Sequence, residues 1–129
     1  MKNKWLLIAS ISGFFCVAMG AFAAHGLSKI LDNKALMWID TALKYQMFHT
    51  LAILSIGLVQ IGRQPFVFNK TFNLAASAWS LGVFLFSGSL YALALGAGKW
   101  MVWVTPVGGV LFLIGWLCLA YGSIKCKSV

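Results

Sequence analysis

One short stretch of the sequence places four polar or aromatic groups at helical spacing. Trp38, Thr41, Tyr45 and His49 recur every three or four residues, which puts them on one face of a helix. This face offers an indole, a hydroxyl, a phenol and an imidazole. A second histidine, His25, ends an earlier apolar run in GAFAAHGL. Polar groups in apolar surroundings need hydrogen-bond partners, so this stretch predicts either a binding site or a set of buried polar contacts.

Several kinds of chemistry use histidines with nearby hydroxyls. Two histidines on neighbouring helices can ligate a b-type haem, but the sequence guarantees no slot between opposed rings. A zinc enzyme needs a third ligand and a general base, and the chain has no glutamate. A serine hydrolase needs a nucleophile elbow, which is absent, although FSGSLY contains two serines. The sequence therefore predicts no catalytic residue and no metal site, leaves the cofactor unknown, and keeps open a pocket for a lipid, quinone, ion or small solute.

The opposite face of the same stretch carries a charged pair. Asp40 and Lys44 are four residues apart with the acid first, the favourable order for an ion pair on a helix. We expect this pair to support the helix surface by about 0.2–0.5 kcal/mol. Lys44 is expected to lie close enough to the helix end for its ammonium group to reach the interface.

Polar residues in the later apolar segments extend the candidate site. If the helices that carry them converge, these side chains surround one pocket that faces the outer side of the membrane. The alternative interpretation is that each one only satisfies a neighbour in the packed interior. The candidate binding residues are His25, Thr41, Tyr45, Gln46, His49, Ser87, Ser89, Tyr91 and Thr105.

The composition indicates where these residues are held. The chain has 129 residues, of which 61% are hydrophobic and 9% are charged, far below the roughly 25% charged residues of soluble domains. The net charge of +8 arises because only two residues are acidic. Basic residues that form no stripe with interleaved aromatics do not indicate nucleic-acid binding, so we expect no nucleic-acid partner.

Four segments are apolar over about the 20 residues that a helix needs to cross a bilayer. They predict an all-α membrane protein with a single domain at 1–129, built as an antiparallel bundle of four transmembrane helices. The first segment is longer than the apolar part of a signal peptide, so we expect it to be retained. The predicted spans are 5–24, 41–61, 74–97 and 101–122.

The connections between these segments carry further predictions. Apolar and polar residues alternate over 26–40, which predicts a short amphipathic helix on the outer interface between the first two spans. Pro65 predicts a turn after the second span. Gly13 and Gly20 are seven apart, as are Gly108, Gly115 and Gly122, so we expect the first and fourth helices to pack closely.

Lysine and arginine residues predict the orientation. With both termini in the cytoplasm, six basic residues lie inside and four outside. The inner set is Lys2, Lys4, Arg63, Lys70, Lys125 and Lys127, and the outer set is Lys29, Lys34, Lys44 and Lys99.

Four sequence blocks occur in order along the chain, namely GAFAAHGL, WIDTALKYQMFHTLA, FSGSLY and TPVGGVLFLIGW. Together they resemble the family of small bacterial membrane proteins that includes YgdD and YwdK, over essentially the whole chain. The family has no known function, so the resemblance implies a four-helix architecture and an inner-membrane location without a reaction. It places His25, Tyr45, Gln46, His49, Ser87, Gly88, Pro106 and Gly109 in the family's motif blocks.

We therefore expect an integral inner-membrane protein with a non-enzymatic binding or helper role, centred on a His/Tyr/Ser cluster near the outer face. Membrane lipids are the expected partners, together with a second copy of the chain or another membrane protein. One alternative is a small transporter or channel subunit for an ion or small solute. The other is a redox protein that binds haem or quinone.

Overall fold

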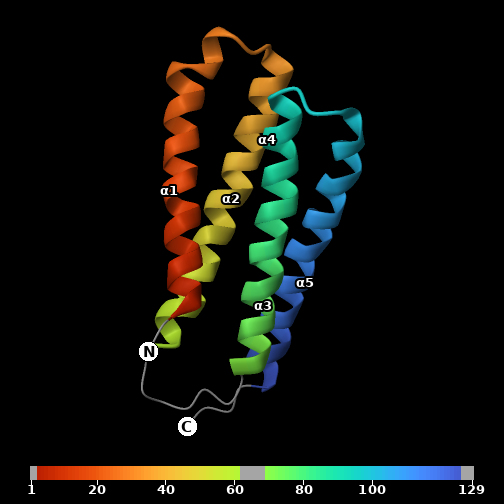
Figure 1. Ribbon diagram of the computed structural model, residues 1–129. Helices are drawn as coiled ribbons and strands as arrows, with labels where there is room; N and C mark the ends of the chain where they lie inside the picture. Colours follow the sequence, from red (N-terminus) through yellow and green to blue (C-terminus); the bar gives the residue numbers. More distant parts are fainter. Residues whose placement is uncertain (1–2, 62–68, 126–129) are drawn as a thin grey trace.

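The computed structural model describes residues 3–61 and 69–125, and every regular element in these two ranges is a helix (Figure 1). The α-helices are α1 (Lys4–His25), α2 (Asn33–Val59), α3 (Asn69–Gly82), α4 (Gly88–Ala94) and α5 (Val104–Lys125). Three shorter elements join them: the 3-10 turns η1 (Leu27–Lys29) and η3 (Lys99–Trp103) and the π-helical segment η2 (Val83–Ser87). Because η2 connects α3 directly to α4, these three form one long helix.

Four helical spans are long and apolar enough to cross a membrane. They are Lys4–Lys29, Asn33–Val59, Lys70–Ala94 and Lys99–Lys125. The all-helical membrane fold predicted from the sequence is therefore confirmed.

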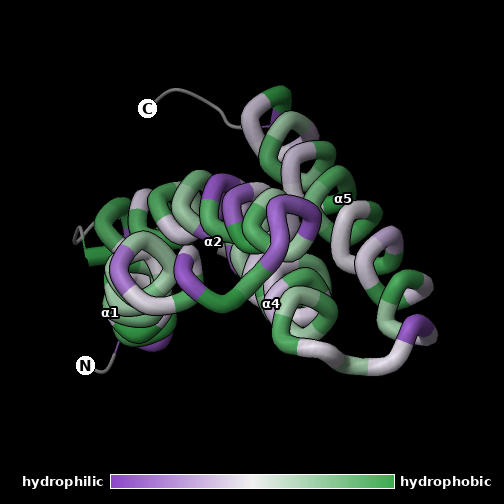
Figure 2. Tube along the Cα trace, turned by 90° about the horizontal axis from the view of Figure 1, so that it is seen from above, coloured by the Kyte–Doolittle hydropathy of each residue, from purple (hydrophilic) through white to green (hydrophobic). Residues whose placement is uncertain are grey.

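The four spans stand side by side in the order α1, α2, α3–α4, α5. α1 packs against α2, α2 packs against α3, η2 and α4, and α5 packs against α3 and η2. In Figure 1, α1 and α3–α4 run upward while α2 and α5 run downward, and Figure 2 shows α1 and α5 on opposite sides of the molecule. The prediction that the first and fourth helices pack closely is wrong, because the glycines of α5 face α3 and η2 instead.

The second span begins earlier than the sequence predicted. The Asp32 side chain accepts a hydrogen bond of 2.8 Å from the Ala35 amide and so caps α2 at Asn33. Most of the segment expected to form a separate amphipathic helix is therefore the first part of α2, and only Leu27–Lys29 forms a short turn of its own. The turn predicted at Pro65 lies outside the described residues.

The third span ends before the predicted boundary at Ala97. Its last helix, α4, ends at Ala94. Gly96 follows with a φ of +100°, a left-handed conformation that glycine adopts without steric cost and that commonly terminates helices.

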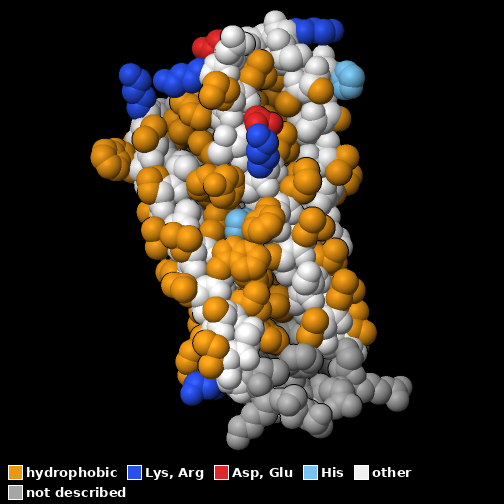
Figure 3. All heavy atoms as spheres, turned by 180° about the vertical axis from the view of Figure 1, so that it is seen from behind, with side chains coloured by type: hydrophobic (Ala, Val, Ile, Leu, Met, Phe, Trp, Pro, Cys, Tyr) orange, Lys and Arg blue, Asp and Glu red, His pale blue; other side chains and the backbone are white. Residues whose placement is uncertain are grey.

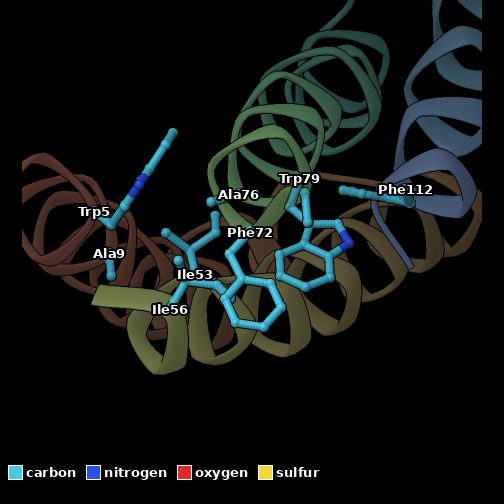
Figure 4. Packing of buried hydrophobic residues seen from close by; sticks show 9 residues of the cluster. Trp5, Ala9, Ile53, Ile56, Phe72, Ala76, Trp79 and Phe112 are labelled. Atoms are coloured by element: carbon cyan, nitrogen blue, oxygen red, sulfur yellow. The ribbon is translucent and has the colours of Figure 1, made fainter. Parts of the chain in front are cut away.

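Aromatic side chains of α3 and η2 fit against glycines of α5. Three aromatic residues seven apart face three glycines seven apart: Phe72 with Gly122, Trp79 with Gly115 and Phe86 with Gly108. A Cβ atom at Gly115 would meet the indole of Trp79, which is 1% exposed and lies in the main hydrophobic core. Figure 4 shows Trp79 beside Phe112 of α5 in this core. The glycines thus allow α5 to approach α3 closely.

Candidate functional site

Gln46 connects three helices through its side-chain amide. Its Nε2 atom donates to the carbonyl oxygen and to Oγ of Ser12 on α1, at 3.1 and 3.2 Å. Its Oε1 atom accepts a 2.6 Å hydrogen bond from the hydroxyl of Tyr91 on α4. Gln46 is only 6% exposed. It therefore links α1 and α4 across the groove described below.

Two further contacts hold the surroundings of Gln46. The hydroxyls of Ser12 and Thr50 lie 2.6 Å apart and join α1 to α2. The Ser87 hydroxyl, in the π-helical segment, donates a 2.8 Å bond to the carbonyl oxygen of Ala42. Both Ser87 and Thr50 are buried, so the polar groups around Gln46 are held in place from several sides.

A groove of about 470 Å³ lies between α1 and the α3–α4 helix, with α2 at its floor. We call it the lateral groove. Ile11, Phe15 and Phe84 line it and are at least half exposed, so it opens on the surface that faces lipid. Its lining consists of Ile8, Ile11, Ser12, Phe15, Met19, Gln46, Ile53, Ser80, Val83, Phe84, Ser87, Gly88 and Tyr91.

The hydrogen-bond donors that line the lateral groove are already engaged. Tyr91 donates to Gln46, Ser87 donates to Ala42, and Ser80 donates a 2.7 Å bond to the carbonyl oxygen of Ala76. Hydroxyl oxygens keep lone pairs that accept further bonds. The lining residues include no charged side chain. The groove is therefore suited to a neutral ligand that donates a hydrogen bond.

His49 belongs to a separate aromatic cluster between α2 and α5. Its Nδ1 atom lies 2.8 Å from the carbonyl oxygen of Tyr45, and its Nε2 atom lies 3.0 Å from the indole nitrogen of Trp116. Because an indole nitrogen only donates, Nε2 is the acceptor and Nδ1 carries the hydrogen of a neutral ring. The ring stacks on Phe112 with 3.7 Å between centroids and 7° between planes. Both ring nitrogens are thus occupied within the protein.

Ser89 and Thr105 form a third polar contact, between α4 and α5. Their hydroxyl oxygens lie 2.5 Å apart, and Ser89 also donates a 2.8 Å bond to the carbonyl oxygen of Phe86. Ser89 is 1% exposed. This contact supports the helix after its π-helical segment.

The candidate residues therefore separate into distinct places. Gln46, Ser87 and Tyr91 line the lateral groove. The other four candidates lie at contacts with α5: Tyr45 and His49 against Phe112, and Ser89 with Thr105. His25, the last residue of α1, is exposed and joins none of these clusters. Thr41 is half-buried on α2 outside the groove lining.

Gln46 lies deeper along its helix than the sequence suggested, whereas Tyr91 lies three residues before the end of α4 and Thr105 is the second residue of α5. Gln46 is thirteen residues from either end of α2 (Asn33–Val59). The difference follows from the start of α2 at Asn33, since the predicted start at Thr41 placed Gln46 within two turns of the helix end.

Sequence reasoning missed Ser12, Thr50 and Trp116, which form hydrogen bonds in these clusters. Ser12 offered a usable signal, because it is a polar residue within the first apolar run. Trp116 gave no signal, because its register opposite His49 depends on how α5 docks. Among residues 3–61 and 69–125, no three histidine, cysteine or acidic side chains come together as a metal site.

Comparison with known proteins places the chain among membrane proteins without an assigned activity. Residues 19–109 match the family described as "Protein of unknown function (DUF423)". The chain is 60% identical over 129 residues to a UPF0382 membrane protein of Haemophilus influenzae, with both chains fully covered. It is 46% identical to the UPF0382 inner membrane protein YgdD of Escherichia coli K12, covering 98% of this chain and 95% of YgdD.

A more distant relative, a UPF0382 membrane protein of Staphylococcus saprophyticus, is 37% identical over 94% of this chain and 97% of its own. No solved structure matches the fold. The chain therefore belongs to the DUF423 family, together with the UPF0382 membrane proteins.

Proposed function

We propose that this protein binds a neutral, hydroxyl-bearing lipid in its lateral groove, as a non-enzymatic binding protein of the membrane. The observation that carries the proposal is the groove itself, about 470 Å³, within the roughly 300–1,000 Å³ of ligand sites. It is apolar along most of its lining, opens toward lipid, and has the Ser12, Gln46 and Tyr91 side chains at its floor.

The polar groups that line the lateral groove indicate which class of ligand it binds. Gln46 lies at mid-length of α2, and its partner Tyr91 lies three residues before the end of α4, so the polar groups of the groove extend from the middle of α2 toward one end of the bundle. A charged group has no counter-ion among the lining residues. The free lone pairs of Tyr91 and Ser87 favour a hydroxyl donor over a quinone carbonyl, which only accepts.

The histidines support this proposal better than the redox alternative. A haem ligated by His49 would have to displace Tyr45 or Trp116 from a ring nitrogen. His25 lies at the exposed end of α1. The groove uses neither histidine.

Filling the groove tests the proposal. Gly88 lines the groove, and a Cβ atom there would meet no atom within 4 Å, so the first side-chain atom of Gly88→Leu enters free space and we expect the variant to fold. We expect native mass spectra of protein released in mild detergent to show a bound neutral lipid in the parent and at least a tenfold lower occupancy in Gly88→Leu.

Gly20→Leu is the matched control. Gly20 also has open space around its Cβ position but does not line the groove, so its lipid occupancy should equal that of the parent. Equal occupancy in Gly88→Leu and the parent, or a parent without bound lipid, would disprove the proposed function.

We also propose that both termini face the cytoplasm. Lys4, Lys70 and Lys125 lie at the end of the molecule that holds the start of α1 and the end of α5, and Lys29, Lys34 and Lys99 lie at the other (Figure 1). In the sequence, Lys2 precedes α1, Arg63 falls between α2 and α3, and Lys127 follows α5, which brings the inner set expected from the sequence to six basic residues against four in the outer set. This excess favours the cytoplasm for the termini.

Reporter fusions measure this orientation. Alkaline phosphatase fused after residue 129 is expected to be inactive and a green fluorescent protein at the same site fluorescent, because the first folds only outside and the second only inside. A phosphatase inserted after Asn33 should be active. The reverse pattern at both sites would place the termini outside.

A further inference from the structure

The charged pair of α2 lies deeper in the membrane than its place in the sequence suggests. Lys44 Nζ is 2.8 Å from Asp40 Oδ2, and the two side chains are 73% and 63% exposed. The carbonyl oxygen of Leu43 accepts a hydrogen bond from the thiol of Cys16, near the middle of α1. The backbone of Lys44, next to Leu43, therefore lies level with the middle of α1. Asp40 lies about 9 Å below the level at which α1 ends, at about 1.5 Å per residue.

Lipid is an unfavourable neighbour for this pair. Charged side chains at membrane depth almost always face protein or a water-filled cavity. Here the pair lies on the outer surface of α2, and Figure 3 shows an acidic and a basic side chain side by side within a largely hydrophobic face. Met37, Met47 and Phe48 on the same side of α2 are more than half exposed. This face therefore lacks the protein cover that its charges require.

We propose that a second copy of this chain covers this face, with α2 packed against α2. An acid and a base on one face are self-complementary under a two-fold axis. With the axis along the membrane normal, both copies keep the same orientation and their charges lie at equal depth. Each Lys44 ammonium then lies between its own Asp40 carboxylate and that of the other copy.

The flanking side chains suit the same interface. Methionine is flexible and adapts to irregular contacts, and Met37 and Met47 lie above and below the pair on α2. A different membrane protein would need its own charges at matching depth, whereas a second copy supplies them by symmetry. The lateral groove lies between α1 and α3–α4, so the dimer leaves it open.

Charge exchange tests the proposal. The protein, with a fluorescent protein at its C-terminus, is reconstituted into phosphatidylethanolamine and phosphatidylglycerol vesicles at low protein density, and photobleaching steps are counted. The parent is expected to bleach in two steps. Asp40→Lys alone and Lys44→Asp alone should each associate at least about tenfold more weakly, because like charges then meet.

Mixing these two variants supplies the decisive result. One variant carries two lysines and the other two aspartates, so together they are complementary and two-colour co-localisation should return to the parent's level. The double variant Asp40→Leu with Lys44→Leu carries neither charge of the pair, so a charge cannot prevent its insertion into the membrane. We expect this variant to be monomeric and to bleach in one step. Lys34→Asp and Gly88→Leu are controls expected to remain dimeric.

Other results overturn the proposal. A parent that bleaches in one step shows that no second copy covers the face, and a phospholipid that remains bound to that monomer identifies the cover instead. A doubly apolar variant that stays dimeric shows that the interface lies elsewhere. Because the lipid occupancy of the groove is measured separately, none of these outcomes bears on the proposed binding function.

Discussion

Gly108→Ala is expected to destabilise the protein by about 2–3 kcal/mol, whereas the same change at the next residue leaves it stable. A Cβ atom at Gly108 would overlap the backbone nitrogen of Phe86 and come within 2.8 Å of its Cα atom. Backbone atoms in the interior of a helix cannot move aside as the end of a side chain can. The substitution must therefore push α5 away from η2.

Gly109→Ala is the matched control. Its Cβ atom would lie 3.8 Å from the Phe86 ring, an ordinary van der Waals contact. We expect the free energy of unfolding to change by no more than about 0.5 kcal/mol. Reversible unfolding in mixed detergent and dodecyl sulfate micelles, followed by circular dichroism, measures both variants. Equal stability of the two would mean that α5 does not approach η2 as closely as the structure has it.

His49→Ala should cost about 2–4 kcal/mol of unfolding free energy, because the stacked ring is lost and the partly buried indole N–H of Trp116 is left unpaired. His49 is 3% exposed, stacks on Phe112 at 3.7 Å and accepts from Trp116. His49→Gln keeps an acceptor for Trp116 and should recover part of the loss. The same micelle unfolding experiment applies.

His25→Ala separates this role from a general effect of losing a histidine. His25 is exposed at the end of α1, so the unfolding free energy should change by less than about 0.5 kcal/mol. The lipid occupancy of the groove should persist in His49→Ala. A variant that kept full stability but lost a bound molecule would show that His49 is a ligand and not a packing residue.

Much of the fold could be predicted because bilayer thickness and hydrogen bonding leave few choices. Apolar runs of about 20 residues predict transmembrane helices whatever other helices they pack against. The described residues contain four such helices. The neighbours of each helix were harder to predict. The glycines seven apart in the fourth segment indicated a close approach, but they do not name the partner, and the matching aromatics Phe72, Trp79 and Phe86 had not been read as a series.

The sequence predicted several of the residues that form polar contacts, but it did not predict that these residues fall into separate clusters. The shared face of Tyr45 and His49 followed from helical periodicity, and both join one aromatic cluster. The link from Gln46 to Tyr91 could not be predicted, because it depends on the relative height of α2 and α4. The predicted second span begins at residue 41, whereas α2 begins at Asn33 after the cap at Asp32. The predicted position of Gln46 along its helix was therefore too close to the helix end.

The order of the helices also has a consequence for how the chain enters the membrane during synthesis. The outer helices α1 and α5 expose most of their surface, whereas α2 and the Lys70–Ala94 span are less apolar and more buried between them. α2 carries Asp40, Lys44, Gln46 and His49, and each such residue opposes partition from the translocation channel into lipid. Because α1 emerges first and packs on α2, the two can leave the channel as a hairpin in which Ser12 already accepts from Gln46. The last helix then closes the second hairpin over Trp79 in the same way, so that each polar inner helix enters lipid beside an apolar companion.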